Sequence, residues 1–249
     1  MELRARTFRK IHRWLGVVIG IQFLMWTSGG LYFSRNPIEK VHGETEKAPP
    51  KPLGVTSPLA SPDRGILALL ADRPQAEVRS VTLRPHLESA VYEIAYVDRG
   101  QPRWVLADAA TGGLRGAVGE DEAREIAIRS YLPGSPVRDV SLVTEAAPGS
   151  EYRERPLPAY RVSFDDALGT RIYVSAERGL VTARRNDRWR LFDLLWMFHI
   201  MDYEHRDDFN TPLLQVVSGL GLATILSGFA LFAVTSPRLW RRAPFRKRT

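Results

Sequence analysis

Two histidines in the 249-residue sequence stand where an imidazole could ligate a cofactor metal. His12 lies just before an uncharged apolar stretch, residues 14–34, and helical steps of three or four residues place Gly16, Gly20, Phe23 and Thr27 on its face. A histidine above a groove of small residues leaves room for a flat cofactor. The alternative is ordinary close packing of two helices through the Gly16-x-x-x-Gly20 pattern.

His199 lies in a second and shorter apolar segment, residues 191–201, where Asp193 is the other polar residue. On a helix, Asp202 and Tyr203 would share its face, three and four residues further on. A carboxylate at Asp202 could accept the second ring proton of His199 and fix its tautomer, as it does for metal-bound histidines. The alternative is a capping or otherwise satisfied histidine at the membrane interface. The remaining histidines are assigned to the surface: His42, His86 and His205.

Several other chemistries are absent from the sequence. The chain has no cysteine, which excludes disulfides, thiolate metal sites and covalent haem attachment. It also has no nucleophile elbow, P-loop, dinucleotide fingerprint or HExxH motif. Asp165-Asp166 precedes Gly169 and is typical of a turn rather than of a catalytic carboxylate pair. A self-contained hydrolase is therefore not expected.

Two apolar segments predict membrane spans. Residues 14–34 are 21 residues without a charge, and at about 1.5 Å rise per residue they cross a hydrocarbon core of about 30 Å. This run exceeds the usual 7–15-residue core of a signal peptide, and bulky rather than small residues follow it, so we expect an uncleaved anchor. Residues 212–236 form the second span, with the proline at position 212 tolerated in the first helical turn.

The charge distribution predicts the topology. Of 35 Lys and Arg residues, five lie in residues 1–13 and six in residues 237–249, which leaves 24 basic and 27 acidic residues between them. The whole surplus of positive charge therefore flanks the spans, as it does on the cytoplasmic side of a membrane. We expect a bacterial inner-membrane protein with cytoplasmic termini and with residues 35–211 in the periplasm. A nucleic-acid partner has no support, and membrane lipid is the expected surroundings.

The periplasmic part predicts an α+β fold. Residues 35–62 are rich in proline and predict an extended linker. Two helix-and-strand modules then follow, at residues 63–116 and 117–187, before an interfacial helix and turn at residues 188–211. Helices are expected at residues 63–71 and 120–131, and strands at residues 78–83, 92–97, 103–106, 137–143, 159–164 and 171–174. Each module would lay an antiparallel sheet against its helix.

The two modules resemble a known family. The residues that carry the first resemblance are Tyr92-x-Ile94, Trp104-Val-Leu-x-Asp108 and Gly112; they resemble the PepSY module of thermolysin-type propeptides. The corresponding residues of a second copy are Tyr160-x-Val162, Ile172-Tyr-Val-Ser175 and Gly179. Tyr92 and Tyr160 are 68 positions apart, and Gly112 and Gly179 are 67 apart, which favours a repeat. The resemblance implies a fold and does not by itself imply an activity.

The first span also resembles a family. His12-x-Trp14-Leu-Gly16, with Ser28-Gly29 near the far end, is similar to the PepSY-associated transmembrane family. That resemblance implies haem b held without covalent bonds by His12 and His199, in an electron-transfer component linked to periplasmic reduction of ferric iron or ferric siderophores. Larger relatives have four or more spans, whereas this chain has two. The alternative is a non-enzymatic tether whose PepSY pair binds or regulates a periplasmic protein or peptidase.

The predicted positions of the two histidines imply a homodimer. His12 would lie at the cytoplasmic end of the first span and His199 on the periplasmic side, about 30 Å away. One chain could not hold one haem with both residues. Two-fold association would pair His12 with its copy and His199 with its copy, because such a contact pairs like with like on its axis.

Overall fold

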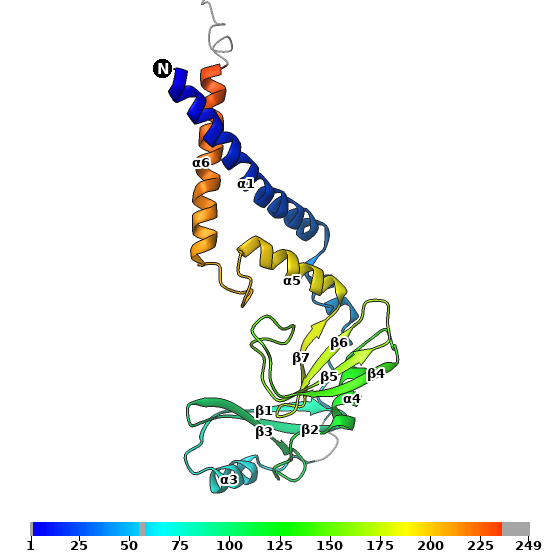
Figure 1. Ribbon diagram of the computed structural model, residues 1–249. Coiled ribbons are helices and arrows are strands. Elements are labelled where there is room, and N and C mark those ends of the chain that lie inside the picture. Colours follow the sequence, from blue (N-terminus) through cyan, green and yellow to red (C-terminus); the bar gives the residue numbers. More distant parts are fainter. Residues whose placement is uncertain (1, 55–57, 236–249) are drawn as a thin grey trace, which may run out of the picture. The chain divides into compact units, whose positions relative to one another are not determined.

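The computed structural model describes residues 2–54 and 58–235, and the chain divides into two compact units. The first contains the segment up to Arg35 together with the segment from Phe192 onwards, and the second is Asn36–Leu191. Their elements are labelled in Figure 1. We call them the helical unit and the sheet unit and describe each by itself. The predicted basic tail, residues 237–249, lies outside the described residues.

The helical unit contains both predicted spans. Helices α1 (Glu2–Arg35) and α6 (Pro212–Thr235) include two segments long and apolar enough to cross a membrane, His12–Arg35 and Pro212–Phe232. Their mean hydropathies are 1.4 and 1.7. Large apolar side chains such as Leu24, Leu222 and Phe229 are exposed, which suits a lipid environment better than water. Helix α1 starts earlier than the predicted span, because the basic segment continues the same helix.

Helices α1 and α6 lie together near the start of α1 and diverge towards α5 (Asp187–Ile200), as Figure 1 shows. At the contact, a β-carbon on Gly221 would come within 3.3 Å of the Phe23 ring and 3.8 Å of Ile19. Ile19 is fully buried there. By contrast, a β-carbon on Gly16 or Gly20 would meet nothing within 4 Å among the described residues. The glycines that pack the two helices are therefore on α6.

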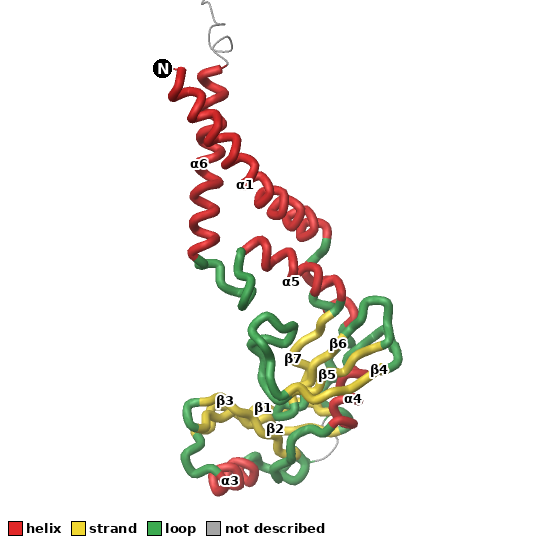
Figure 2. The backbone as a smooth tube through the Cα atoms, in the orientation of Figure 1, coloured by secondary structure: helices red, strands yellow, loops and turns green. Residues whose placement is uncertain are grey.

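The sheet unit confirms the α+β prediction and contains two antiparallel sheets. Figure 2 shows their strands in yellow. The first sheet has the order β1-β2-β3, with β1 Glu77–His86, β2 Ser89–Asp98 and β3 Gln101–Asp108. Helix α3 (Asp63–Asp72) packs on one face of it, where Leu69 meets Tyr92, Ile94 and Ala107. These sheet residues alternate along β2 and β3, as a half-buried strand requires.

The second sheet has one strand more than the sequence predicts. Its order is β4-β5-β6-β7, with β4 Val137–Val143, β5 Ala159–Phe164, β6 Arg171–Ser175 and β7 Leu180–Arg185. The last strand, with the sequence LVTARR, ends in two arginines and lacks a clear apolar alternation, which explains why the pattern does not reveal it. Helix α4 (Glu120–Arg129) packs on this sheet through Ala123 and Ala127, as its spacing predicts.

A single core joins the two sheets. Val91 and Leu106 of the first sheet are buried in one cluster with α4 and with Val162, Ile172 and other residues of the second sheet. Strand β2 is therefore buried on both faces, since Tyr92 and Ile94 point to α3 while Val91 points to α4. The predicted tyrosine equivalence is only partial, because Tyr92 is buried and Tyr160 is half-buried.

The turns after β3 and β6 have the same backbone geometry. Gly112 donates its N–H to Asp108 O over 2.8 Å, and Gly179 donates to Ser175 O over 2.7 Å. Their φ angles are +70° and +57°, which glycine adopts without strain. In each turn the side chain that starts it also accepts a backbone N–H, from Ala110 and Thr111 to Asp108 and from Arg178 to Ser175.

The segment predicted as a plain linker is partly folded. It contains a short helix α2 (Ile38–Val41) and the 3-10 turn η1 (Glu44–Glu46), and Val41 is fully buried. Ala48 N–H donates to Ser130 O over 3.0 Å, and Leu132 N–H donates to Glu46 O over 2.9 Å. The prolines that suggested a spacer begin after these contacts, at position 49. The start of the linker is therefore part of the sheet unit.

The other face of the second sheet is covered by the β4–β5 loop, which supplies a partly buried carboxylate, Glu151. It accepts hydrogen bonds from Arg171 Nη1 at 2.8 Å, Tyr173 Oη at 2.7 Å and Arg190 Nε at 2.9 Å. Burial alone would raise the pKa of Glu151, but these donors outweigh it and lower the pKa below its usual value. Its stabilising effect is therefore present above the unfolded pKa and is lost as pH falls through the folded one.

We expect the Glu151→Gln variant to be less stable than the parent at pH 7 and to show a weaker loss of stability below about pH 5. The reason is that glutamine forms weaker hydrogen bonds to the two arginines and does not titrate. Thermal unfolding of the full chain in detergent at a series of pH values measures this. Parallel pH profiles for the two proteins would contradict the assignment.

Candidate functional site

His12 contacts the facing helix through its ring. Its Nδ1 lies 2.6 Å from Ser227 Oγ on α6, and a β-carbon on Gly228 would lie 3.7 Å from His12 Cε1. The absence of a side chain at position 228 thus lets the imidazole approach the helix. The sequence places His12 on the helix that carries Gly16 and Gly20, but it does not predict the contact of the His12 ring with Ser227.

The contact with Ser227 fixes the tautomer of His12. Ser227 Oγ also lies 2.8 Å from Thr224 O, and a carbonyl oxygen can only accept a hydrogen bond. The single hydroxyl proton of Ser227 therefore goes to Thr224, and Oγ must accept a proton from His12 Nδ1. In the neutral ring, Nε2 then carries the lone pair. An imidazole held in this way by its Nδ1–H is prepared for coordination through Nε2.

His199 sits in an aromatic surrounding near the end of α5. Its ring stacks on Trp196 at 5.9 Å between centroids with a 9° interplanar angle, and it lies 6.2 Å from Trp26 and 6.1 Å from Phe33. Two side chains of α1 hold the end of this helix. Trp26 Nε1 donates to His199 O over 2.9 Å, and Gln22 Nε2 donates to Phe198 O over 3.1 Å. These bonds satisfy carbonyls that a helix C-terminus leaves free.

A cavity of about 450 Å³ adjoins His199. It is lined by Trp26, Trp196, His199, Ile200, Phe209, Leu214 and Ser218. His199 Nδ1 is buried and has no hydrogen-bond partner among the described residues. A buried polar atom without a partner costs free energy, which a bound ligand at this nitrogen would remove. An apolar cavity of this size with one free imidazole nitrogen is the usual form of a small-ligand site.

The predicted support of His199 by Asp202 is not what the structure shows. Helix α5 ends at Ile200, and Met201 has φ +55°, so the chain turns away before Asp202 and the two residues share no helical face. The carboxylate of Asp202 accepts four backbone N–H groups, from Glu204, His205, Asp207 and Asp208. Burial raises its pKa, but these four bonds prevail and lower the pKa to about 2. Asp202 shapes the loop before α6.

The two histidines lie far apart along the helical unit. The ring of His199 contacts Trp26 and Phe33, which are 14 and 21 residues beyond His12 on the same helix. At 1.5 Å per residue, these contacts lie about 20–30 Å from His12 along the axis. One chain therefore does not bring both imidazoles to one metal. Among the described residues, no group of three or more His, Asp or Glu side chains could hold a metal ion without a cofactor.

His86 is the histidine that the sequence places wrongly. It is buried in the sheet unit rather than at the surface, and its Nε2 lies 2.6 Å from Glu122 Oε1, which also accepts from Arg115 at 2.7 Å. Burial lowers the pKa of His86 more than Glu122 raises it. Along β1, Val81 and Leu83 lie on one face and His86 lies on the other with Arg84, so the apolar alternation gives no signal that His86 is buried.

Comparison of the chain with protein-family models, with curated proteins and with solved structures gave no match. The resemblance to the PepSY families therefore stays an expectation from the residues quoted for it. What can be said of function depends on the two histidine sites and on the sheet unit.

Proposed function

We propose that this protein is an inner-membrane, PepSY-like electron-transfer component that binds haem b and serves the reduction of periplasmic ferric iron or ferric siderophores. Its termini are cytoplasmic, and its sheet unit is periplasmic, because the surplus of positive charge flanks both spans on one side. The equal turn geometry at Gly112 and Gly179 supports two PepSY-like repeats in the sheet unit.

The observation that carries the haem proposal is the fixed tautomer of His12. Ser227 Oγ accepts a hydrogen bond from the Nδ1–H of His12, which would leave the Nε2 lone pair free to bind haem iron. His199 supplies a second candidate ligand, with a buried nitrogen that lacks a partner and a cavity beside it. Haem b, when bound, supplies a one-electron couple. The chain's own part is to hold the imidazoles in position and to surround them with apolar and aromatic side chains that exclude water.

The separation of the two histidines supports a homodimer. Since one chain does not bring them together, bis-histidine ligation needs a second copy, and two-fold symmetry would pair each histidine with its own counterpart. Gly16 and Gly20 lie open on α1, where they leave room for close approach of a second helix or of a porphyrin. Two such sites in one dimer would form an electron path across the membrane.

The test is a reduced-minus-oxidised absorption spectrum of the full chain, purified in detergent after expression with haem supply. We expect Soret and α bands, which diminish in His12→Ala and in His199→Ala and vanish in the double variant. His205→Ala is the matched control, because His205 is exposed in the loop before α6. The absence of bands in the parent protein, or bands unchanged in the double variant, would remove the haem proposal.

A second variant tests the tautomer argument. Ser227→Ala keeps both histidines but removes the acceptor of the His12 Nδ1 proton. Loss of such an orienting partner typically weakens metal binding by about 10- to 100-fold. We therefore expect haem retention to fall in Ser227→Ala, with Thr224→Ser as a control that keeps the backbone acceptor of the Ser227 hydroxyl.

A second function is a membrane-tethered binding module. The observation that favours it is that Asn36–Leu191 forms a compact unit with its own buried core clusters, none of which includes His12 or His199. In that case the spans only anchor the unit, which binds or regulates a periplasmic protein or peptidase. The spectrum discriminates the two functions, because this one requires no haem bands.

A further inference from the structure

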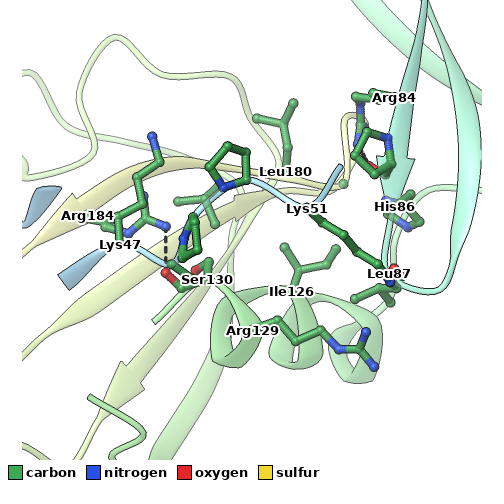
Figure 3. A pocket seen from close by; sticks show the side chains of 16 residues that line it. Lys47, Lys51, Arg84, His86, Leu87, Ile126, Arg129, Ser130, Leu180 and Arg184 are labelled. Atoms are coloured by element: carbon green, nitrogen blue, oxygen red, sulfur yellow. Dashed lines mark hydrogen bonds between the residues drawn. The ribbon is translucent and has the colours of Figure 1, made fainter. Parts of the chain in front are cut away.

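A basic groove lies within the sheet unit, between the two sheets and helix α4. Figure 3 shows its lining, and its volume is about 360 Å³. We define the basic groove by its five cationic side chains: Lys47, Lys51, Arg84, Arg129 and Arg184. They come from four different parts of the chain, namely the segment after η1, the end of β1, helix α4 and strand β7. No Asp or Glu side chain lines the groove among the described residues.

Carboxylates outside the groove neutralise its cations only in part. Lys51 and Arg129 share Glu88, whose side chain is 73% exposed. Arg84 shares Glu93 with Arg178, an arginine that does not line the groove. Lys47 pairs with Glu44 at 3.7 Å, and Arg129 also pairs with Glu125, again at the surface. These exposed pairs leave much of the positive field of the lysines and of Arg129 in place, because water screens each pair. The Arg84–Glu93 pair, by contrast, is largely buried.

Arg184 is the groove's least compensated cation. No carboxylate lies within ion-pair distance of it among the described residues, and its Nη2 donates to the carbonyl oxygen of Ser130 over 3.2 Å. Its Nε is buried without a partner. Burial lowers the pKa of Arg184 more than the nearby carboxylate of Glu44 raises it, so the folded unit carries a desolvated charge whose cost an anion could reduce. This is a second and independent indication of an anionic ligand.

The groove also has an apolar wall. Ile126 of α4 lies opposite Leu180 in Figure 3. Val181 and Pro49 also line the groove. Residues 47–51 border the groove on one side, and hydrogen bonds from Ala48 to Ser130 and from Leu132 to Glu46 hold this segment in place. These boundaries and the volume match a drug-sized ligand, for which pockets of about 300–1,000 Å³ are usual. An extended peptide would need a longer open channel than this groove provides.

We propose that the basic groove binds a small organic molecule with two or more carboxylate or phosphate groups beside an apolar body. The cations hold the anionic groups and the apolar wall holds the body. The inference goes beyond haem binding and does not depend on it, because every residue that carries it belongs to the sheet unit.

The experiment is isothermal titration of the full chain in nanodiscs of neutral lipid. The probes are benzene-1,3,5-tricarboxylate, phenyl bisphosphonate and the neutral benzene-1,3,5-tricarboxamide. We expect either anion to bind, the amide not to bind, and high salt to weaken the anions by screening. The ratio of the affinities of the two anions then shows whether the groove prefers carboxylate or phosphonate groups. Equal binding of the anions and the amide would overturn the proposal, as would tighter binding of a hexaglutamate peptide.

Variants locate the site. Lys47→Gln/Lys51→Gln removes two exposed charges and is expected to weaken the anionic probes by about tenfold. Lys40→Gln/Arg138→Gln is the matched control, because it removes two exposed cations of the same unit away from the groove. Arg184→Gln is expected to give a larger loss, with circular dichroism as the check on folding. Equal affinities for the first two variants would overturn the assignment even if Arg184→Gln fails to fold.

Discussion

Replacing Glu93 with alanine is expected to lower the free energy of unfolding of the sheet unit by about 3 kcal/mol. Glu93 is a buried carboxylate on β2, with Oε1 at 2.8 Å from Arg178 Nη2 and Oε2 at 3.3 Å from both Arg178 Nε and Arg84 Nε. It thereby joins the first sheet to the β6–β7 turn. Removing it leaves two largely buried guanidinium groups without their carboxylate, which costs more than the pair itself contributes.

Other contacts at this joint, which we define as Glu93, Arg84 and Arg178, support the same expectation. Arg178 lies over the Trp104 ring at 4.9 Å from its centroid, and Arg84 donates a short hydrogen bond to the Arg178 carbonyl oxygen. Burial lowers the pKa of Arg84, which indicates that its charge depends on Glu93 for compensation. Without Glu93 the two arginines repel each other across the joint.

Chemical denaturation of the full chain in detergent, followed by far-ultraviolet circular dichroism, measures the effect. Glu88→Ala is the matched control, since Glu88 also contacts two cations but is exposed, and we expect no measurable change there. Glu93→Gln should fall between the parent and Glu93→Ala because it keeps an acceptor. Equal stabilities of Glu93→Ala and Glu88→Ala would show that the joint contributes little.

The sequence predicts the elements of the sheet unit well because its core residues follow simple periods. Strands β4 and β5 have the predicted bounds, and α4 buries Ala123 and Ala127 as its spacing requires. Strand β7 is not predicted, because it is held in the sheet by backbone pairing with β6 and has no regular apolar alternation that the sequence would reveal. The ion pairs of Glu93 that link the two sheets are not predicted either, because the spacing of a glutamate in a strand does not show whether it is buried or exposed.

The candidate site is predicted less well, because it depends on where helices end. Steps of three and four residues correctly select α1 as the helix that carries His12, but they cannot identify Ser227, which is 215 positions away. The pairing of His199 with Asp202 assumes a continuous helix, but the positive φ of Met201 ends the helix at Ile200, two residues before Asp202. The role of Asp202 therefore depends on the backbone turn at Met201. The sequence does not predict this turn, because a positive φ is uncommon for methionine.

Replacing Gly179 with alanine is expected to cost about 3 kcal/mol of unfolding free energy. Gly179 has φ +57°, where an L-residue with a side chain is strained by about 1 kcal/mol. In addition, its new β-carbon would lie 2.7 Å from His86 Cε1 and 2.8 Å from Val118 Cγ2. Both neighbours are buried between the two sheets, so neither can move without disturbing the core, and such overpacking costs about 1–3 kcal/mol.

Gly100→Ala separates the two contributions, because Gly100 has φ +77° but a β-carbon there would meet nothing within 4 Å among the described residues. It therefore reports backbone strain alone, and we expect a loss of about 1 kcal/mol. The difference between the two variants, about 2 kcal/mol, is the packing cost at Gly179. If both variants lose the same stability in denaturant unfolding, the β6–β7 turn does not press against His86 and Val118. The two sheets would then pack less closely at the β6–β7 turn than the contacts of Gly179 indicate. Both the role of Glu93 and the shape of the basic groove depend on that close packing.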